Sequence, residues 1–551
     1  VFYDKPLLKF ERLLETYLSF APKGLKSFFT AIPVWLREKM FLKKVIFDEL
    51  AAIDDYDKSN IQLLFPEHHL SHAASAFYPS PYSESAILTI DGVGEWATAS
   101  ICHGAGSEIT IKKELTFPHS LGLLYSAFTY YLGFRVNSGE YKLMGLAPYG
   151  NPGSDQVREF IDTIKSELIT MYDDGSIWLN QNYFSYATGL RMVNEKKWKA
   201  LFGFPRRTPE TELKQHEANL ALAIQKVTEE IVITMARHAR EITGSNHICL
   251  AGGVALNCVA NGLLQEENIF DDIYIQPAAG DAGGALGAAL AAEHIYFGNE
   301  RTPQQPDAMS GAYLGPQFSG FEIIKQVRSY KPIYKEYNED QLYDLVASRI
   351  QQGNIAGWFQ SRMEFGPRAL GARSILADPR SPEMQKKLNL KIKYRESFRP
   401  FAPSVLEEDV AKYFDFTQAS PYMLLVHKVH NDIRKNLPDD YSQLPLRQKL
   451  AYVRSDLPAI THVDFTARIQ TVHKSTNPRY WKLLDAFKTL TGCSVLVNTS
   501  FNVRGEPIVC TPKDAYRCFM STEMDLLVME NYVFLKEEQP IFTDKIEFKK
   551  D

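Results

Sequence analysis

Long hydrophobic runs and closely spaced cysteines are both missing from the sequence. No apolar run approaches the ~18 to 20 residues needed to span a bilayer, and no signal-like apolar segment follows a basic start. The six cysteines among 551 residues are scattered and form no C-x-x-C pair, which excludes a dense disulfide framework. We therefore expect a protein of the reducing cytoplasm that has no membrane partner.

An excess of positive charge is missing as well. The 61 Lys and Arg residues against 66 Asp and Glu give a net charge of -5, and the pI is near 6.3. This balance provides no general attraction to nucleic acid or anionic lipid, although local basic patches remain compatible with it. With 45% hydrophobic residues, the chain is long enough for two or more domains with buried cores. Small-molecule chemistry is the class of function that we expect.

The chain starts with VFYDKPLLKFERLL, without an initiator Met and inside an apolar, strand-like run, so we expect further residues upstream. Residues 7–50 have the apolar spacing of helices. Residues 301–319, RTPQQPDAMSGAYLGPQFS, are rich in Pro, Gly, Gln and Ser and have no periodicity, as in interdomain linkers. The sequence therefore predicts two domains, residues 1–310 and 311–551.

Glycine-containing turns follow apolar runs in the first predicted domain. Residues 83–104, SESAILTIDGVGEWATASICHG, read as two strands joined by a turn that starts at Asp91. Further on, the strand-like HICL precedes Gly252 and Gly253, which let backbone N–H groups approach an anion at a helix N-terminus. Asp281 then starts a helix of small residues, DAGGALGAALAA. This order of strand, glycine turn and helix predicts an α/β nucleotide-binding fold.

Two histidines in PEHHLSHAASAFY, His68 and His72, are four residues apart, so a helix places them on one face, where both can reach one metal. On the pair alone, a solvated helix face is the more frequent explanation, and a third, carboxylate ligand is needed. Asp91 and Asp281 are the candidates. No glutamate follows His68 as in H-E-x-x-H, which disfavours zinc-peptidase chemistry. His69 cannot share the face, and we expect it to be exposed or to lie behind the ligands.

Six cations of the second predicted domain are interleaved with glycine and proline between residues 362 and 399. They are Arg362, Arg368, Arg373, Lys393, Arg395 and Arg399. Arginine presents planar donor pairs to phosphate oxygens, but a solubilising surface would explain the same composition. The later NTSFNVRGEP, residues 498–507, adds hydroxyl and amide donors. Together these segments suggest a triphosphate pocket, which is not a Walker P-loop because G-x-x-x-x-G-K-S/T is absent.

Eight sequence blocks, in order, extend over almost the whole chain: HHLSHAASAFYPS, LTIDGVGEWAT, GEYKLMGLAPYG, LAGGVALNCVANG, GDAGGALGAAL, EFGPRALGARSILADPR, KYRESFRPFAPSV and NTSFNVRGEPIV. Together they resemble the NodU/CmcH/TobZ-type O-carbamoyltransferases. The resemblance implies α/β and α+β architecture, an N-terminal ASKHA domain (actin/Hsp70-like, TsaD-like) followed by a C-terminal YrdC-like domain. The family normally begins with a strand and a first phosphate loop, which are not found before Val1.

The family's chemistry, as the resemblance implies it, has two steps. The YrdC-like domain converts carbamoyl phosphate and ATP, with Mg, to carbamoyladenylate. The TsaD-like domain then transfers the carbamoyl group to a hydroxyl of a small natural product, such as an antibiotic, a toxin or an oligosaccharide. We expect no nucleic-acid partner and leave a homodimer open.

The resemblance also implies roles for single residues. The metal ligands and catalytic residues are His68, His72, Asp91 and Asp281, with Fe(II) or another divalent metal as the cofactor. The residues that bind ATP and carbamoyl phosphate are Arg368, Lys393, Arg395, Arg399, Arg468, Asn498, Ser500 and Asn502. A nucleotide in the N-terminal domain would contact Gly92, Gly252, Gly253 and Asn257. We expect the acceptor site to be lined by Ser120, Leu121, Gly122, Glu140 and Lys142.

One family block departs from its pattern. H-V-D-G-x-x-R reads HVDFTAR here, with Phe465 at the usual glycine, so we expect the loop before Arg468 to bend without glycine's freedom. Two other functions are weighed against the carbamoyltransferase. A threonylcarbamoyl transferase acting on tRNA would share both domain types, but the acidic balance disfavours it. A nucleotide-gated binding protein without catalysis is the third hypothesis.

Overall fold

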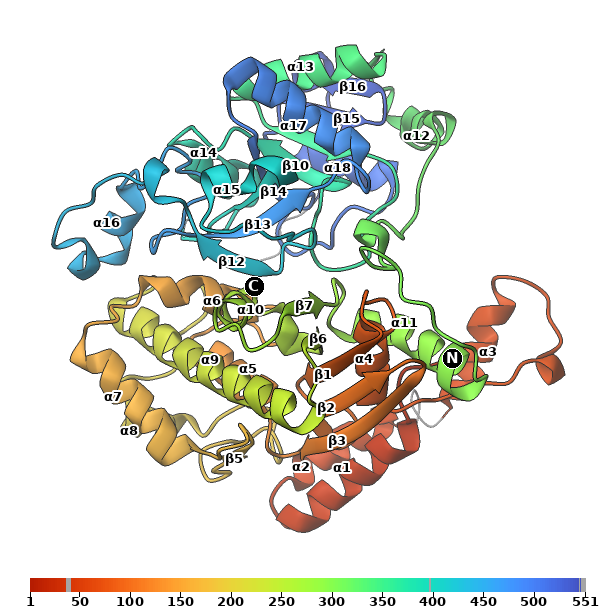
Figure 1. Cartoon of the computed structure of the whole chain (residues 1–551), viewed down its shortest axis with the longest axis vertical. Coiled ribbons are helices and arrows are strands. Elements are labelled where there is room, and N and C mark those ends of the chain that lie inside the picture. The colour runs from red at the N-terminus through yellow and green to blue at the C-terminus, as the bar shows by residue number, and fades with distance from the viewer. Residues whose placement is uncertain (36–40, 396–397, 545, 547–551) are drawn as a thin grey trace. The chain divides into compact units, whose positions relative to one another are not determined.

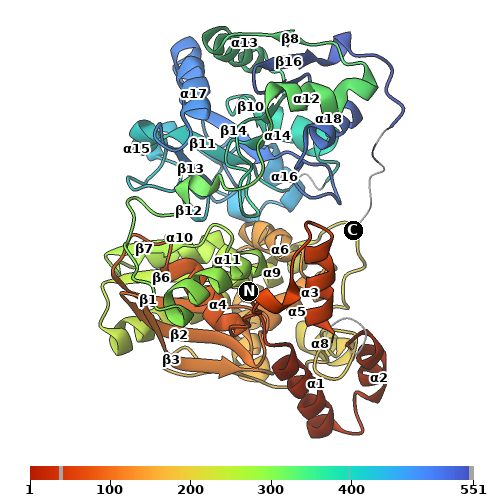
Figure 2. The same cartoon turned by 90° about the vertical axis from the view of Figure 1, so that its right-hand side faces the viewer.

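The computed structural model describes residues 1–35, 41–395, 398–544 and 546, and the chain divides into two compact units (Figures 1 and 2). The first unit comprises Val1–Met144, Pro152–Glu212 and Asn219–Ala308. The second comprises Gly145–Asn151, Leu213–Ala218 and Met309–Asp551. Two short segments from the first half of the chain therefore belong to the second unit.

The strands of the first unit are β1 (Glu84–Ile90), β2 (Ala97–Ala105), β3 (Glu108–Thr116), β4 (Ile169–Met171), β5 (Ile177–Leu179), β6 (His247–Ala251) and β7 (Asp272–Ile275). The helices before β6 are α1 (Pro6–Phe20), α2 (Leu25–Val34), α3 (Leu42–Ala51), α4 (His68–Phe77), α5 (Leu121–Tyr131), α6 (Glu140–Leu146), α7 (Asp155–Thr163), α8 (Glu195–Phe202) and α9 (Gln215–Thr243). Two helices follow β6, α10 (Cys258–Glu266) and α11 (Asp281–Ala291). The helical spacing predicted for residues 7–50 corresponds to α1–α3, with residues 36–40 outside the described part.

The main sheet of the first unit has the order β3-β2-β1-β6-β7. The predicted hairpin is confirmed, because β1 pairs antiparallel with β2, and β1 also runs parallel to β6. Successive side chains of a strand point to opposite faces. Leu88 and Ile90 therefore face α9, where Val232 lies beside them, whereas Thr89 faces α4 and is hydrogen-bonded to His69. Figure 1 shows α4 and α11 on one side of this sheet and α9 on the other.

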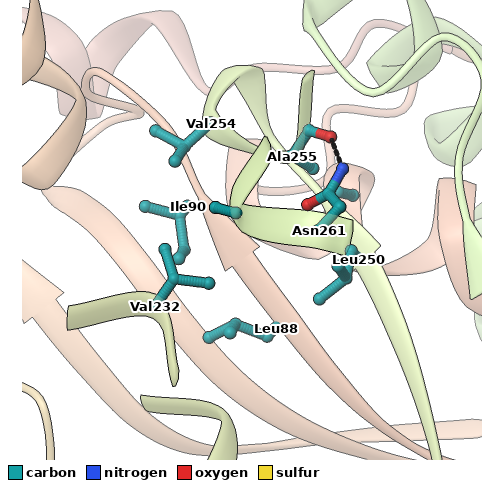
Figure 3. A pocket seen from close by; sticks show the side chains of 9 residues that line it. Leu88, Ile90, Val232, Leu250, Val254, Ala255 and Asn261 are labelled. Carbon is teal, nitrogen blue, oxygen red and sulfur yellow. Dashed lines mark hydrogen bonds between the residues drawn. The ribbon is translucent and has the colours of Figure 1, made fainter. Parts of the chain in front are cut away.

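Between the sheet and α9 lies a small apolar void, seen in Figure 3. It is lined mainly by Leu88, Ile90, Val232 and Leu250, and the Asn261 amide beside it donates to a backbone carbonyl. Its volume of about 10 Å³ is at the lower limit for a single water. It is therefore a packing defect of the core, too small for a ligand. An apolar stripe of α9 packs into the same core, since all its members are buried: Leu220, Ile224, Val227, Ile231 and Met235.

The second unit is built on a nine-stranded sheet of order β12-β13-β11-β14-β10-β9-β15-β16-β8. Its strands are β8 (Lys335–Glu336), β9 (Ala356–Phe359), β10 (Arg373–Ala377), β11 (Ala402–Leu406), β12 (Leu425–Lys428), β13 (Thr466–Val472), β14 (Val495–Ser500), β15 (Leu526–Met529) and β16 (Tyr532–Leu535). Its helices are α12 (Gly320–Val327), α13 (Glu339–Gln351), α14 (Met384–Lys387), α15 (Val410–Tyr413), α16 (Leu446–Ala451), α17 (Pro478–Thr491) and α18 (Pro512–Ser521). The protein is thus mixed α/β with two large sheets. Among the residues described, no helix has both the length and the hydrophobicity of a membrane span.

Candidate functional site

Helix α4 begins at His68, and its start is fixed by a buried carboxylate. Glu95, in the turn after β1, accepts hydrogen bonds from the backbone N–H of His68 at 3.0 Å and of Lys5 at 2.7 Å. One carboxylate thereby satisfies donors at the first turns of both α4 and α1, which otherwise lack partners. With the helix start fixed, His68 and His72 face the same way, and their Nε2 atoms are 3.1 Å apart.

Asp91 directly follows β1 and brings a carboxylate to the histidine pair. Its Oδ2 lies 3.0 Å from Nε2 of His68 and 3.6 Å from Nε2 of His72. Its Oδ1 accepts a hydrogen bond of 3.0 Å from the N–H of Gly253. The turn can approach because Gly252 has φ = 88° and because a Cβ there would lie 2.3 Å from the Ile90 carbonyl oxygen. The predicted glycine turn therefore holds Asp91 in place.

Asp281, the first residue of α11, supplies the second carboxylate. The face of α11 that packs on α4 is made of small residues, and a Cβ at Gly287 would lie 1.8 Å from the Ser71 carbonyl oxygen. This close packing brings Asp281 Oδ1 within 3.7 Å of Nε2 of His68 and 3.8 Å of Nε2 of His72. Three segments that are far apart in the sequence thus meet at one point.

The four side chains form a cluster that could hold a metal ion, with ligand atoms within 4.8 Å of one another. Imidazole nitrogen and carboxylate oxygen are donors that suit divalent zinc, iron or manganese. The side chains of His68 and His72 are 2% and 0% exposed, but that of Asp281 is 61% exposed. The cluster is therefore closed at the histidines and accessible at Asp281, as a catalytic metal with an open position requires.

The electrostatics of the cluster are strongly coupled. Burial alone would lower the pKa of His68, but hydrogen bonds to Asp4 and Asp91 outweigh it and raise that pKa to about 9. Burial likewise opposes ionisation of Asp91, yet hydrogen bonds from His68 and His72 hold its pKa well below the usual range. Both pKa shifts thus favour a protonated His68 between the carboxylates of Asp4 and Asp91.

His69 lies outside the ligand cluster, and it is buried, so exposure is the wrong part of its prediction. Its Nδ1 lies 2.7 Å from the Thr89 hydroxyl on β1. Burial, with the charges of His72 and His68, lowers its pKa to about 3, so it is a neutral ring that packs behind the ligands.

Asp4 is the contact that sequence reasoning missed. Its Oδ1 lies 2.8 Å from Nδ1 of His68 and 2.7 Å from the ammonium of Lys9. The only local signal was a charged Asp-Lys pair after the apolar VFY, which does not indicate a partner 64 residues away. Glu95 was missed for the same reason.

The residues expected to line an acceptor site also hold local structure. Ser120 caps α5 and donates from its hydroxyl to the carbonyl of Gly92 at 2.7 Å, which fixes the loop that carries Asp91. A Cβ at Gly122 would lie 2.5 Å from the Asp91 carbonyl oxygen. Leu121, between Ser120 and Gly122 in the sequence, is buried. Their acceptor role stays a prediction.

Two further residues of the expected acceptor wall belong to α6. Glu140 accepts hydrogen bonds from the Ser126 hydroxyl and from the N–H groups of Asn137 and Gly139, as a residue at a helix start does. Lys142 is 3% exposed. A buried lysine is unusual, and the acceptor role of Lys142 too stays a prediction.

Asn257, expected to contact a nucleotide, uses both ends of its amide inside the first unit. Its Oδ1 accepts from the N–H of Ala260 and from Gln225, and its Nδ2 donates to Gln225 at 3.1 Å. It therefore caps α10 and ties it to α9. A nucleotide contact through this side chain remains a prediction.

In the second unit, the structure brings Lys393, Ser500 and Asn502 together. The Lys393 ammonium donates to the backbone carbonyl of Ser500, to the Ser500 hydroxyl at 3.2 Å, and to Asn502 Oδ1 at 2.8 Å. Burial, with the positive charges of Arg395 and Arg399, lowers the pKa of Lys393 well below its usual value. A buried cation flanked by others is a suitable partner for a polyanion.

The remaining predicted nucleotide ligands are placed as follows. Arg395 donates to Asn389 at 2.8 Å and lies over the Phe401 ring, whereas Arg399 is 8% exposed. Asn498, in β14, donates to Ala369, Ser404 and Gln470, which ties three strands and a loop together. Arg368 precedes β10 and Arg468 lies in β13, and both are partly buried. Their binding roles stay predictions.

Two expectations for this unit are wrong. Arg373 is no phosphate ligand, because it is fully buried, donates to carbonyls of Gln360 and Pro316, and lies 3.6 Å from the Phe359 ring centroid. Six cations in one stretch therefore do not form one cluster. The loop before Arg468, expected to bend without glycine's freedom, instead has Phe465 at a glycine-like φ of 65°, at a cost of about 1 kcal/mol or more.

Comparison with known proteins adds the family. The pattern described as Carbamoyltransferase N-terminus matches residues 1–290, and the one described as Carbamoyltransferase C-terminus matches residues 347–536. The chain belongs to the carbamoyltransferase family. The predicted resemblance to NodU and cephem O-carbamoyltransferases is thereby confirmed, and this carbamoyltransferase is an enzyme by family.

Similar proteins align with between about half and nearly all of this carbamoyltransferase. Uncharacterized protein sll1178 of Synechocystis sp. is 58% identical and covers 98% of this chain and 87% of its own length. Nodulation protein NolNO of Sinorhizobium fredii is 39% identical over 91% of this chain and 67% of its own. The 3'-hydroxymethylcephem-O-carbamoyltransferase of Amycolatopsis lactamdurans is 33% identical over 53% and 49%. A solved structure of HypF from T. kodakarensis matches 44% of this chain and 38% of its own, with 12% identity and a TM-score of 0.22, too low to support an argument.

Proposed function

We propose that this carbamoyltransferase is an ATP-dependent O-carbamoyltransferase with two active sites. The first unit would be a TsaD-like ASKHA domain that transfers the carbamoyl group, and the second a YrdC-like domain that makes carbamoyladenylate. The observation that carries the proposal is the cluster of His68, His72, Asp91 and Asp281, because a family enzyme with a preformed, accessible ligand set has a place for transfer chemistry. Fe(II) is the metal that we propose for it.

The activation step would occur in the second unit. Carbamoyl phosphate, ATP and water would give carbamoyladenylate, pyrophosphate and phosphate, because the C–O bond to phosphate breaks and carbamate attacks the α-phosphorus of ATP. The new mixed anhydride has AMP as a good leaving group. Lys393 and the nearby Arg395 and Arg399 would offset the negative charge that builds up on the phosphates. The Lys393 ammonium donates to oxygens of Ser500 and Asn502, and this fixed position supports the proposed role.

The transfer step would occur at the histidine and aspartate cluster. A bound divalent metal supplies Lewis acidity that polarises a carbonyl or phosphate oxygen. His68, His72 and Asp91 form its closed side, so the substrate must enter beside the exposed Asp281. There an alcohol of the acceptor attacks the carbamoyl carbon, AMP leaves, and the hydroxyl proton passes to a base that is not assigned.

The acceptor class follows from the relatives. One relative is named a 3'-hydroxymethylcephem-O-carbamoyltransferase, and two others are named nodulation proteins. We propose a hydroxyl of a small natural product, an antibiotic, toxin or oligosaccharide, as the acceptor here. The acceptor's identity within this class needs a chemical screen.

Paired variants test the two sites separately. Exchange of radioactive pyrophosphate into ATP, dependent on carbamoyl phosphate, reports activation, and mass spectrometry of acceptors for one added carbamoyl group reports transfer. Lys393→Met should lose exchange and keep its metal, with Lys391→Met, an exposed lysine paired with Glu523, as the control. His68→Ala should bind metal much more weakly and lose transfer at limiting metal, but keep exchange.

The matched control for His68→Ala is His103→Ala, in β2, whose ring lies beside Glu84 and away from the cluster. Loss of exchange in both Lys393→Met and Lys391→Met would mean that the charge acts only generally. No exchange by the unaltered protein with carbamoyl phosphate and ATP would overturn the activation step. Transfer that survives without metal in His68→Ala would overturn the role of the cluster.

A further inference from the structure

We propose that Asp4 is a positioning residue of the metal centre, which orients the His68 ring and fixes its tautomer so that Nε2 faces the metal. This inference rests on the proposed metal at the cluster of His68, His72, Asp91 and Asp281. It concerns a residue that precedes every sequence block by which the site was predicted. It also assigns a purpose to the ion pair between the buried Asp4 and the partly exposed Lys9, which the proposed reaction does not use.

The geometry at His68 uses both ring nitrogens in different ways. Nδ1 lies 2.8 Å from Asp4 Oδ1, on the side away from the cluster. Nε2 lies 3.0 Å from Asp91 and 3.7 Å from Asp281, on the side of the cluster. A carboxylate accepts only, so a metal-bound His68 must donate its Nδ1–H to Asp4 and present the lone pair of Nε2. Such carboxylate-histidine pairs orient metal ligands and raise their basicity.

Asp4 is itself held on both sides. Its side chain is 10% exposed, and its Oδ1 pairs with the Lys9 ammonium at 2.7 Å, one turn along α1. The backbone is fixed at the next residue, Lys5, because Glu95 accepts hydrogen bonds from the N–H groups of both Lys5 and His68. One buried carboxylate thus sets the distance between the chain at Asp4 and the chain at His68. The fold therefore holds the backbone of both residues in the Asp4–His68 contact.

The two histidine ligands differ in this respect. Nδ1 of His72 is buried and has no hydrogen-bond partner among the residues that the structure describes. Among these residues, nothing comparable to Asp4 contacts Nδ1 of His72, and the polar contacts of its ring are made by Nε2, on the side of the cluster. The geometry points to His68 as the anchored ligand, whose orientation Asp4 sets before a metal binds.

The test is the affinity of the full chain for Fe(II) and Co(II), measured by competition with a chelator, alongside the unfolding midpoint of the metal-free protein. Removal of an outer carboxylate typically costs 10- to 100-fold in metal affinity. We expect a loss of this size for Asp4→Ala, a smaller one for Asp4→Asn, which can still accept from Nδ1, and the smallest for Lys9→Met. Glu67→Gln is the matched control, because Glu67 precedes His68 but pairs with Lys5 at the surface.

A double-variant cycle separates positioning from a general loss of structure. In a His68→Ala background, titrated at metal concentrations that saturate it, adding Asp4→Ala should change the affinity less than twofold. A further drop there, as large as in the unaltered chain, would overturn the inference. The inference would also be overturned if Asp4→Ala and Asp4→Asn both bound metal as tightly as Glu67→Gln. If Asp4→Ala does not fold, Asp4→Asn and Lys9→Met decide by the same criterion. If the unaltered protein binds no metal, the proposed function fails first.

Discussion

The contact between α11 and α4 provides the sharpest test of how the fold builds the metal centre. Gly287 is on the face of α11 that packs on α4, and a Cβ there would lie 1.8 Å from the Ser71 carbonyl oxygen and 2.7 Å from the Ser75 nitrogen. The first distance is 1.6 Å short of the 3.4 Å at which ordinary contact begins. Both neighbours are backbone atoms, so Gly287→Ala can be accommodated only if the two helices move apart.

Such a movement acts directly on Asp281, at the start of α11. If the shift is directed along the line to His68 Nε2, the distance grows from 3.7 Å to about 5.3 Å. Metal–ligand bonds of ~2.0 to 2.2 Å limit two donors on one ion to a separation of about 4.4 Å. We therefore expect Gly287→Ala to weaken metal binding at least tenfold and to destabilise the metal-free protein by about 1 to 3 kcal/mol.

Equilibrium dialysis with metal analysis measures the first effect, and denaturant unfolding in the presence of a chelator measures the second. Gly145→Ala is the control, because Gly145 is helical and a Cβ there meets nothing within 4 Å. It should keep metal affinity and unfold at the same denaturant concentration or a higher one. The reasoning is refuted if Gly287→Ala matches Gly145→Ala in both measurements.

Three other predictions follow from charges in the two units. In the metal-free protein the pKa of His68 is raised from 6.5 to about 9, so its contribution of about 3 kcal/mol is complete below pH 6.5 and is lost as the pH rises through 9. Unfolding at pH 6.5 and 9.5 should show this loss relative to His68→Gln, and a constant difference would contradict it. Arg373→Met should cost at least about 3 kcal/mol, since several carbonyls lose their donor, while metal affinity stays unchanged; an equal midpoint would show that the cation is dispensable. ATP binding should depend on the positive charge of Lys393; titration calorimetry should show roughly tenfold weaker ATP binding for Lys393→Met and unchanged binding for Lys391→Met.

The parts of the fold and site that could be predicted are those with a local signal. The i, i+4 spacing of His68 and His72 requires only a helix, and α4 provides one. Two strand-like runs joined by a glycine-containing turn predicted the β1–β2 hairpin, which places Asp91 at a strand end. The small residues after Asp281 predicted close helix packing. The sequence did not predict which helix would pack on α11, because a face of small residues can pack closely against any helix.

The parts that could not be predicted depend on pairings across the chain. Asp4 and Glu95 are ordinary carboxylates in the sequence, and only the tertiary structure shows them buried against His68. Arg373 illustrates the opposite error. Its position among glycines and other cations suggested phosphate binding, whereas the fold uses its planar donors for backbone carbonyls. The sequence shows that Arg373 has hydrogen-bond donors, but only its burial in the fold shows which acceptors they bind.

The charge balance of the cluster links its structure to its chemistry. Asp91 and Asp281 bring two negative charges to a point that is otherwise lined by buried imidazoles. Asp281 also lies at the first position of α11, where the helix dipole favours a carboxylate. Without metal, the proton on His68 offsets one charge, and Asp4 stabilises that proton from behind. A divalent ion offsets both charges and must displace this proton, so metal affinity should rise with pH up to about 9. The displaced proton is that of Nε2, whereas Asp4 accepts the Nδ1–H, which the metal-bound ring keeps, so removal of Asp4 should weaken the metal more than it weakens the fold.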